Sequence, residues 1–437
     1  MSVNISSKLI SKLGSSNSLL PLATKDIINS TSNTYFSYNA GGTIEGKDRL
    51  VDEVGTGAIW LFGIPTFSKI IDKTLYKFAK ISPDVDVRIL KDKNYLKSAI
   101  KNSPTETIKK EIMQVAKNSS KSKGLSVIKF GLSLSLTMLS YFGLTKIKQN
   151  MTKKNIEKEF IQNKKQERNN YKINYKTNPI FDEIENKKTN VSFGNKHIIK
   201  IAENIMFNPV KNMMVLDSCI SGQRLATARN NNERKELLIK EGTFLFFVYG
   251  AGEFLKKGIN KISEKFFNIP IELDAKFIDS NFANKMLRSK KLQQEVKTFS
   301  NLIKSNNKNE IYDFILQNQN NAVIKAAKKS GIIKTVKDRT GNIKIDTRKY
   351  IDLKEISNLT NNLEKFLQKG KSTNIGKYLN KVKTLKIAST LLNIGICCFT
   401  LGYITPKLIF STREKDQNGN RNFHVKTEYE KELMNQY

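Results

Sequence analysis

The chain has 437 residues, enough for two or three domains with a sizeable core. Its 75 lysine and arginine residues outnumber its 40 acidic residues and give a net charge of +35. This excess predicts an anionic partner, either nucleic acid or an acidic lipid surface, unless it reflects only the composition of an AT-rich genome. The three cysteines are too few for a disulfide framework, and they form no C-x-x-C pair.

Residues 1–45 are rich in Ser, Asn, Thr and Gly, so they predict a disordered or loosely ordered tail with Gly41 and Gly42 as breakers. They hold no apolar core of signal-peptide length, and we expect no cleaved secretion signal. Residues 46–150 form a first repeat half with helices near 47–81 and 124–148. The first helix carries 15 uncharged residues at 54–68, fewer than the ~20 that span a bilayer. Pro65 is expected to kink or end it.

A second apolar run holds 16 uncharged residues between Lys129 and Lys146. Its Leu-Ser alternation is compatible with a strand, but its length and flanking lysines favour a helix. Residues 151–196 predict a charged helix and linker. Residues 197–270 predict the start of a second repeat half, with a helix near 233–267. Its uncharged part, residues 242–252, has 11 residues, which indicates a buried or interfacial helix rather than a span.

Residues 271–384 predict a basic, mostly helical insertion. Within it, Asp338 to Gly341 separate two β-prone segments, which predicts a β-hairpin near 332–347. Residues 385–411 are the best candidate for a transmembrane helix, because 387–406 are 20 uncharged residues bounded by Lys386 and Lys407. Residues 412–437 predict a polar, disordered tail.

Two stretches of the chain share one frame of residues at equal spacing. Each begins with Gly-Thr, has a second glycine after eight positions, an aromatic residue four positions on, a lysine two further on and a closing proline. We therefore predict an internal duplication in which the glycines pack helices, the lysines lie at a membrane interface and the prolines end the helices. The frame residues are Gly55, Gly63, Phe67, Lys69 and Pro83 in the first copy, and Gly242, Gly250, Phe254, Lys256 and Pro270 in the second.

The sequence offers no catalytic residue, cofactor site or metal site, and we expect no enzyme. Its two histidines, His197 and His424, are far apart in the chain. His424 lies four residues before Glu428 in the polar tail, which favours a solvated pair. Arg224 and Arg229, with Asp217, indicate a solvated helix face in preference to a small polar site.

These patterns predict a mainly α-helical, internally duplicated protein of structural or interaction type, associated with the cytoplasmic membrane and with its basic segments in the cytoplasm. Its expected partner is an anionic membrane surface, and the question of a small-molecule ligand stays open. The alternative is a soluble, cytoplasmic, nucleic-acid-binding protein with the apolar runs as its core, in which Lys290, Lys291, Lys328, Lys329, Lys334, Lys337 and Arg339 are the first candidates for phosphate contacts. A second alternative, a small transporter or pore built from two repeats, is weakened by the scarcity of polar residues inside the apolar runs. A simple four-span threading conflicts with the positive-inside rule, because it separates the basic loop 146–241 from the other two basic loops. Two models relieve this conflict: the two glycine-rich segments are interfacial or re-entrant helices that do not cross, or the four apolar runs form a soluble core.

Overall fold

The computed structural model describes residue 13 and residues 19–168, 208–267, 271–338, 340–370, 374–413 and 423–436. Within them the chain is mainly α-helical, as predicted, with one two-stranded hairpin. It divides into two compact units. Unit 1 comprises residues 1–26, 65–133 and 246–399, and unit 2 comprises residues 27–64, 134–245 and 400–437.

The N-terminal segment is helical rather than loose, so the predicted tail is wrong from residue 20 onward. Helix α2 (Leu20–Ile71) is interrupted at Gly42, whose φ of 78° only glycine adopts readily. Before this break Phe36 stacks on Phe410 with ring centroids 6.3 Å apart, and Gly402 approaches Ser32. Composition indicated disorder because it does not report such long-range packing, which orders residues 27–41. Residues 1–12 and 14–18 lie outside the described part.

The two apolar helices of the first half are present as predicted, but each is longer than expected, and Pro65 does not end the first one. Helix α2 continues through Pro65 and passes into η1 (Asp72–Tyr76) and α3 (Lys77–Ala79). The short elements η2 (Val87–Leu90), α4 (Lys93–Lys101) and α5 (Glu106–Lys117) follow, and Thr105 caps α5 by accepting a hydrogen bond from the Ile108 amide. Helix α6 (Ser119–Arg168) then includes the whole second apolar run, so its helical interpretation is confirmed.

In the second half, residues 197–207 lie outside the described part, and the first described helix is α8 (Pro209–Ala226). Its proline stands in the first turn, where its missing amide costs least. After it, α9 (Asn231–Leu245), η3 (Phe246–Ala251) and α10 (Gly252–Phe267) are continuous with one another. They confirm the helix expected near 233–267. Of the charged helix and linker predicted within 151–196, residues 151–168 belong to α6, and the rest lies outside the described residues.

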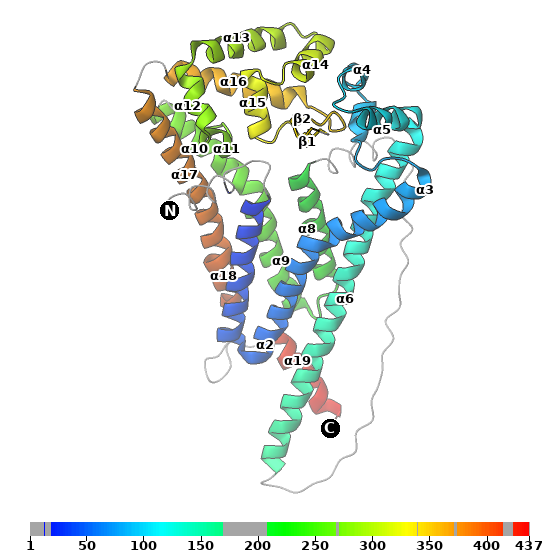
Figure 1. The fold of residues 1–437 in the computed structure, drawn as a ribbon. Coiled ribbons are helices and arrows are strands. Elements are labelled where there is room, and N and C mark those ends of the chain that lie inside the picture. Colours follow the sequence, from blue (N-terminus) through cyan, green and yellow to red (C-terminus); the bar gives the residue numbers. More distant parts are fainter. Residues whose placement is uncertain are drawn as a thin grey trace. The chain divides into compact units, whose positions relative to one another are not determined.

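Unit 1 contains a helical group built around the insertion (Figure 1). Its elements are α11 (Ala275–Ile278), α12 (Asn281–Arg288), α13 (Lys290–Lys304), α14 (Lys308–Gln317), α15 (Ala322–Lys329), β1 (Thr335–Lys337), β2 (Ile343–Ile345) and α16 (Leu353–Gly370). The strands pair antiparallel with Thr335 opposite Ile345, so the expected hairpin is confirmed.

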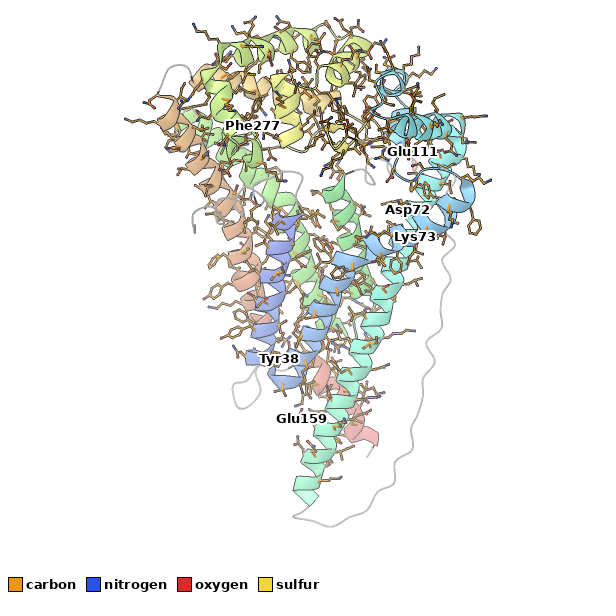
Figure 2. The ribbon with its side chains drawn as sticks, in the orientation of Figure 1. Tyr38, Asp72, Lys73, Glu111, Glu159 and Phe277 are labelled. Carbon is orange, nitrogen blue, oxygen red and sulfur yellow. The ribbon has the colours of Figure 1, made fainter. Side chains whose placement is uncertain are left out.

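One hydrophobic core joins this insertion to the segment that follows the first apolar helix. Its buried residues run from Ile71 to Val115 and from Ile271 to Val382. Tyr95 and Tyr312 meet edge to face in it at 4.9 Å, although they come from α4 and α14. Phe277 of α11, labelled in Figure 2, lies 6.1 Å from the ring of Phe366. The two basic segments therefore fold as a single domain.

The C-terminal elements are α17 (Ile375–Phe399), η4 (Thr400–Ile404), α18 (Thr405–Ser411) and α19 (His424–Gln436). Helix α19 shows that the expected disorder of the tail is wrong for these residues. Phe423 and Val425 are buried with Ile44 and Ile156 in a small cluster of unit 2. This apolar anchor orders a segment that is mostly polar in the sequence.

In the described part of the chain, three helical stretches are long and apolar enough to cross a membrane. They are Leu20–Ala79, Ser119–Lys165 and Ile375–Ser411. In the most apolar 18-residue window of each stretch, the protein itself buries only 11%, 17% and 17% of the residues, respectively. Most of the residues in these windows are therefore at least partly open to the surroundings.

Candidate functional site

The most distinctive feature of unit 2 is a largely buried network of ion pairs. It begins with acidic residues at helical spacing on α2, namely Glu45, Asp48, Asp52 and Glu53. This spacing brings them to neighbouring positions on successive turns. They directly precede the first apolar run, at residues 54–68.

Basic side chains from three other elements meet these carboxylates. Lys148 of α6 lies 3.8 Å from Asp52, and Arg224 of α8 lies 3.3 Å from the same carboxylate. Lys240 of α9 lies 2.5 Å from Glu53. The network thus connects helices from both halves of the sequence.

A second part of the network surrounds Arg229, which follows α8. Its guanidinium lies 3.2 Å from Asp48 and 2.6 Å from Glu233 of α9, and it also lies over the ring of Phe423, 6.0 Å from the centroid. Charged partners on both sides fix this arginine. Its interpretation as part of a solvated face, together with Arg224, was wrong.

Arg413 forms the most buried part of the network. It binds Glu45 through Nη1 at 2.7 Å and Glu236 of α9 through Nε, also at 2.7 Å. The Arg413 side chain is 1% exposed and that of Glu45 is 2% exposed. Desolvation of such charges costs several kcal/mol per ion, so the geometry must be held by paired contacts.

Burial and charge pull the pKa values of the network in opposite directions. Burial alone raises the pKa of Glu241, but Arg224 and Lys240 outweigh it, and the pKa is lowered. Burial lowers the pKa of Lys240, and Glu53 only partly opposes this. Burial acts against the charge of Arg224 too, yet Asp52 and Glu241 hold its pKa well above the usual value. Arg224 therefore remains charged inside the bundle.

A small cavity of about 20 Å³ lies among these side chains. It has room for about one water molecule. Within the described residues, no group of acidic, histidine or cysteine side chains is arranged to hold a metal ion. The residues that line the cavity are Glu45, Asp48, Arg49, Lys148, Arg229, Glu233, Glu236, Leu237, Arg413, Phe423, His424 and Val425.

The repeat-frame glycines have different surroundings in the two copies. A Cβ on Gly55 would lie 2.4 Å from Leu144, and one on Gly63 would lie 3.0 Å from Thr137, so α2 packs closely on α6 there. At Gly242 a Cβ would meet nothing within 4 Å, and at Gly250 it would make ordinary contact with Phe246 of its own helix. Close packing at glycine is thus present in the first copy, and the duplication stays a hypothesis.

The remaining frame residues do not form one site. Phe67 is half-buried, while Lys69, Pro83 and Phe254 are exposed. The first helix ends at Ala79, because Lys80 adopts a left-handed conformation, and Pro83 follows that end. The Lys256 side chain and Pro270 lie outside the described part.

Some of this site was detectable in the sequence. The spaced acids before an apolar run were a visible signal, whereas their partners at 148, 224, 240 and 413 were not linked to them by any local pattern. Comparison with protein-family models, with curated proteins and with solved structures finds no match.

Proposed function

We propose that this chain is a helical membrane protein of structural or interaction type, which carries a basic helical domain on membrane-crossing helices. The observation that supports it is the low burial of the three apolar windows, 11–17%. If these runs were the core of a soluble protein, as in the nucleic-acid alternative, most of their side chains would be buried. Lipid provides the cover that the protein does not.

The uncharged runs end at basic residues, which suits short membrane spans. The first two runs have 15 and 16 residues and reach Lys69 and Lys129, and the third has 20 and starts after Lys386. At 1.5 Å per residue the shorter runs cover ~22–24 Å, less than a ~30 Å hydrocarbon core. Lysine stems that extend toward the headgroups supply the difference.

The unit 1 core constrains the number of crossings. Residues that share one core lie on one side of a membrane, so an even number of crossings separates Val115 from Ile271. Helix α6 supplies one of them under this proposal. A second crossing must therefore lie elsewhere between these two residues.

The unit 2 network narrows the place of that crossing. Lys148 and Glu241 both belong to the network, through Asp52 and Arg224, so an even number of crossings separates them as well. The missing crossing then lies between Glu241 and Ile271, which is the stretch η3–α10. From the sequence alone its 11 uncharged residues are too few for a span, and the proposal replaces this interpretation with a short fourth span. It also replaces the expectation that all basic segments face the cytoplasm, because residues 146–241 then lie opposite the other two basic loops, and long loops cross largely regardless of charge. Lys257 and Lys261 of α10 would end it at the interface.

Cell fractionation with an alkaline carbonate wash tests the membrane proposal. We expect the chain to stay in the washed pellet. Its release by the wash would indicate surface binding, and its absence from the pellet would restore the soluble alternative.

Single cysteines at Lys235 and Lys276, in a chain whose three cysteines are replaced, test the fourth span. They should react with an impermeant maleimide from opposite sides of sealed vesicles; labelling from one side would refute the span.

The proposed partner is an anionic lipid surface around unit 1. Phe78 of α3 is 87% exposed beside Lys73 and Lys77, and Phe254 and Phe266 of α10 are each 72% exposed. Exposed aromatic residues among lysines suit a headgroup layer, where each nearby cation contributes about 1 kcal/mol. Thermal unfolding of the parent chain and of a Lys73→Gln/Lys77→Gln variant, each in nanodiscs with and without phosphatidylserine, tests this binding to anionic lipid. Anionic lipid should raise the melting temperature of the parent more than that of the variant.

Nucleic-acid binding is a second candidate function, supported by one cluster in unit 1. Burial and the neighbouring Lys344 and Lys325 lower the pKa of Lys328. Lys329, Lys334 and Lys337 are exposed nearby in the sequence, and Lys290 and Lys291 are exposed on α13, whereas Arg339 lies outside the described residues. Phosphate groups would relieve this repulsion. An affinity for duplex DNA that falls steeply with salt concentration would support nucleic-acid binding. The absence of binding at low salt would refute it.

A transporter function receives less support. The network is polar and buried, but it flanks the apolar runs in the sequence, and its cavity of about 20 Å³ has no room for a solute. Closely paired charges of this kind are better suited to fixing how helices pack.

A further inference from the structure

Helix α2 folds back on itself at Gly42, within unit 2. The positive φ of Gly42 separates a first arm from a second arm. Beside the turn, a Cβ on Gly46 would lie 2.3 Å from the ring of Tyr38, so a larger residue there would displace the ring. Farther from the turn, the Ser30 hydroxyl donates to Glu53 at 2.8 Å, although 23 positions separate these two residues. The two arms therefore run antiparallel, as the dark-blue and lighter-blue parts of α2 show in Figure 1.

The contact with Glu53 gives the depth of the first arm, residues 20–41, in the proposed membrane. Glu53 directly precedes the first uncharged run, 54–68, so Ser30 lies level with the border of that run. Because the arms are antiparallel, the residues before Ser30 point back in the direction of the run. At 1.5 Å per residue, residues 20–30 cover ~16 Å, against ~22 Å for the run.

The longest uncharged run, in α17 and η4, gives the same depth independently. In unit 2, a Cβ on Gly402 would lie 2.9 Å from the Ser32 hydroxyl. In unit 1, a Cβ on Gly252 would lie 3.3 Å from Nζ of Lys25 and 3.9 Å from Oδ1 of Asn393. This part of the first arm therefore follows the run in the opposite direction and shares its depth.

The first arm is polar on its buried side and apolar on its exposed side. The buried polar residues recur at every fourth position and are Lys25, Asn29, Asn33 and Ser37. Asn33 donates to Asn29 at 2.9 Å, and Asp26, the only acid of this arm, is half-buried. Ile27, by contrast, is 63% exposed, and Ile28 is also exposed. In water the apolar side chains would be the buried ones, whereas in lipid the polar side chains turn to the interior. A lipid environment accounts for this inverted pattern.

Past Ser30 the large exposed side chains become amphipathic. Tyr35 and Tyr38 are exposed on the arm, and Tyr38 is labelled in Figure 2. Tyr403 of η4 is exposed as well, and its ring centroid lies 6.5 Å from that of Phe36. Tyrosine is enriched at membrane interfaces, because its ring suits the apolar region and its hydroxyl suits the headgroups. These tyrosines fit the headgroup layer on the side of the ionic network.

We propose that α2 is a membrane hairpin whose first arm contacts lipid. Residues 20–30 lie among the acyl chains with Ile27 and Ile28 outward, and Tyr35 and Tyr38 lie in the headgroup layer. Lipid is thus the partner of a segment whose composition indicates a loose tail. The inference rests on the proposed membrane function and adds a fifth embedded segment to its four spans.

Spin labels on single cysteines test the hairpin, in the full-length chain with its native cysteines replaced and in lipid nanodiscs. Collisions with oxygen, which concentrates in lipid, and with a nickel chelate, which stays in water, report the surroundings of each label. Ile27→Cys is the test position. Phe62→Cys, exposed on the first run, is the lipid reference, and Asn39→Cys, exposed on the same arm near the turn, is the matched water reference. We expect the ratio of oxygen to nickel collisions at Ile27 to exceed that at Asn39 at least threefold and to approach that at Phe62.

The pattern of labels separates this inference from the proposed function. If the label at Phe62 lies in lipid and the label at Ile27 in water, the first arm is outside the membrane and the hairpin is overturned. If both labels lie in water, the membrane function itself fails, and the hairpin fails with it. Asn29→Cys, on the buried side, should be shielded from both reagents, and oxygen collisions equal to those at Ile27 would overturn the assignment of the two faces. Ile28→Cys provides a second lipid-facing position for the same comparison.

Discussion

Arg413 and Glu45 are 368 positions apart in the sequence, yet their side chains form a buried ion pair of 2.7 Å. The same guanidinium binds Glu236, so one residue near the C-terminus ties together the helix after Gly42 and helix α9. A pair of this kind contributes little net stability compared with apolar packing. Removing one partner is nevertheless strongly destabilising, because it leaves the other charge buried without a counter-charge.

Removal of the Arg413 side chain should therefore destabilise the folded protein strongly. Arg413→Ala leaves two carboxylates buried without their cation, and we expect the free energy of unfolding to fall by about 3–5 kcal/mol. The matched control is Arg234→Ala, because Arg234 is exposed on α9 and should cost no more than about 1 kcal/mol. Thermal unfolding in detergent measures both. A triple variant, Arg413→Met with Glu45→Gln and Glu236→Gln, should recover much of the loss, and equal stability of Arg413→Ala and the control would show that the pair is not formed.

Acid should weaken the network in a defined direction. Burial raises the pKa of Glu241, but Arg224 and Lys240 outweigh it, so the pKa in the folded protein lies below the ordinary 4.5. A carboxyl group with a lowered folded pKa stabilises fully above its unfolded pKa, and this contribution is lost as the pH falls through the folded pKa. Unfolding measured from pH 7 down to pH 3 should show stability falling below about pH 4.5. Glu241→Gln should be less stable at pH 7 and should lose less on acidification.

The two glycines at corresponding frame positions should respond differently to a large side chain. Gly63→Leu forces side-chain atoms against Thr137, and overpacking of this kind costs about 1–3 kcal/mol or more. Gly250→Leu has ordinary contacts only with Phe246 and should be nearly neutral. The melting temperatures of both variants test this expected difference in stability. Equal losses would indicate that the two copies pack alike, as a strict duplication requires.

The sequence predicted the parts of this fold that depend on local pattern. The α6 helix, the hairpin with Asp338 and Gly341 at its turn, and the apolar run at 387–406 were all visible, because periodicity, turn residues and length report local structure. The ordering of residues 20–41 was not visible, because it depends on contacts such as Phe36 with Phe410. The ionic network was missed for the same reason: helical spacing shows which acids share a face, but not which bases approach it.

The unit 1 core offers a prediction that is independent of the membrane. Phe277 is fully buried between Phe282 and Phe366, so Phe277→Ala should lower the free energy of unfolding by about 3–5 kcal/mol through lost burial and a cavity. Phe254→Ala is the matched control, because that ring is 72% exposed and its removal leaves no cavity. Hydrogen exchange at the amides of α4 and α14, which belong to the two segments of this core and pack against one another, should rise in the first variant and stay unchanged in the second. If Phe277→Ala leaves this exchange unaltered, residues 71–115 and 271–382 do not share one cooperative core, and the crossing count that rests on that core fails with it.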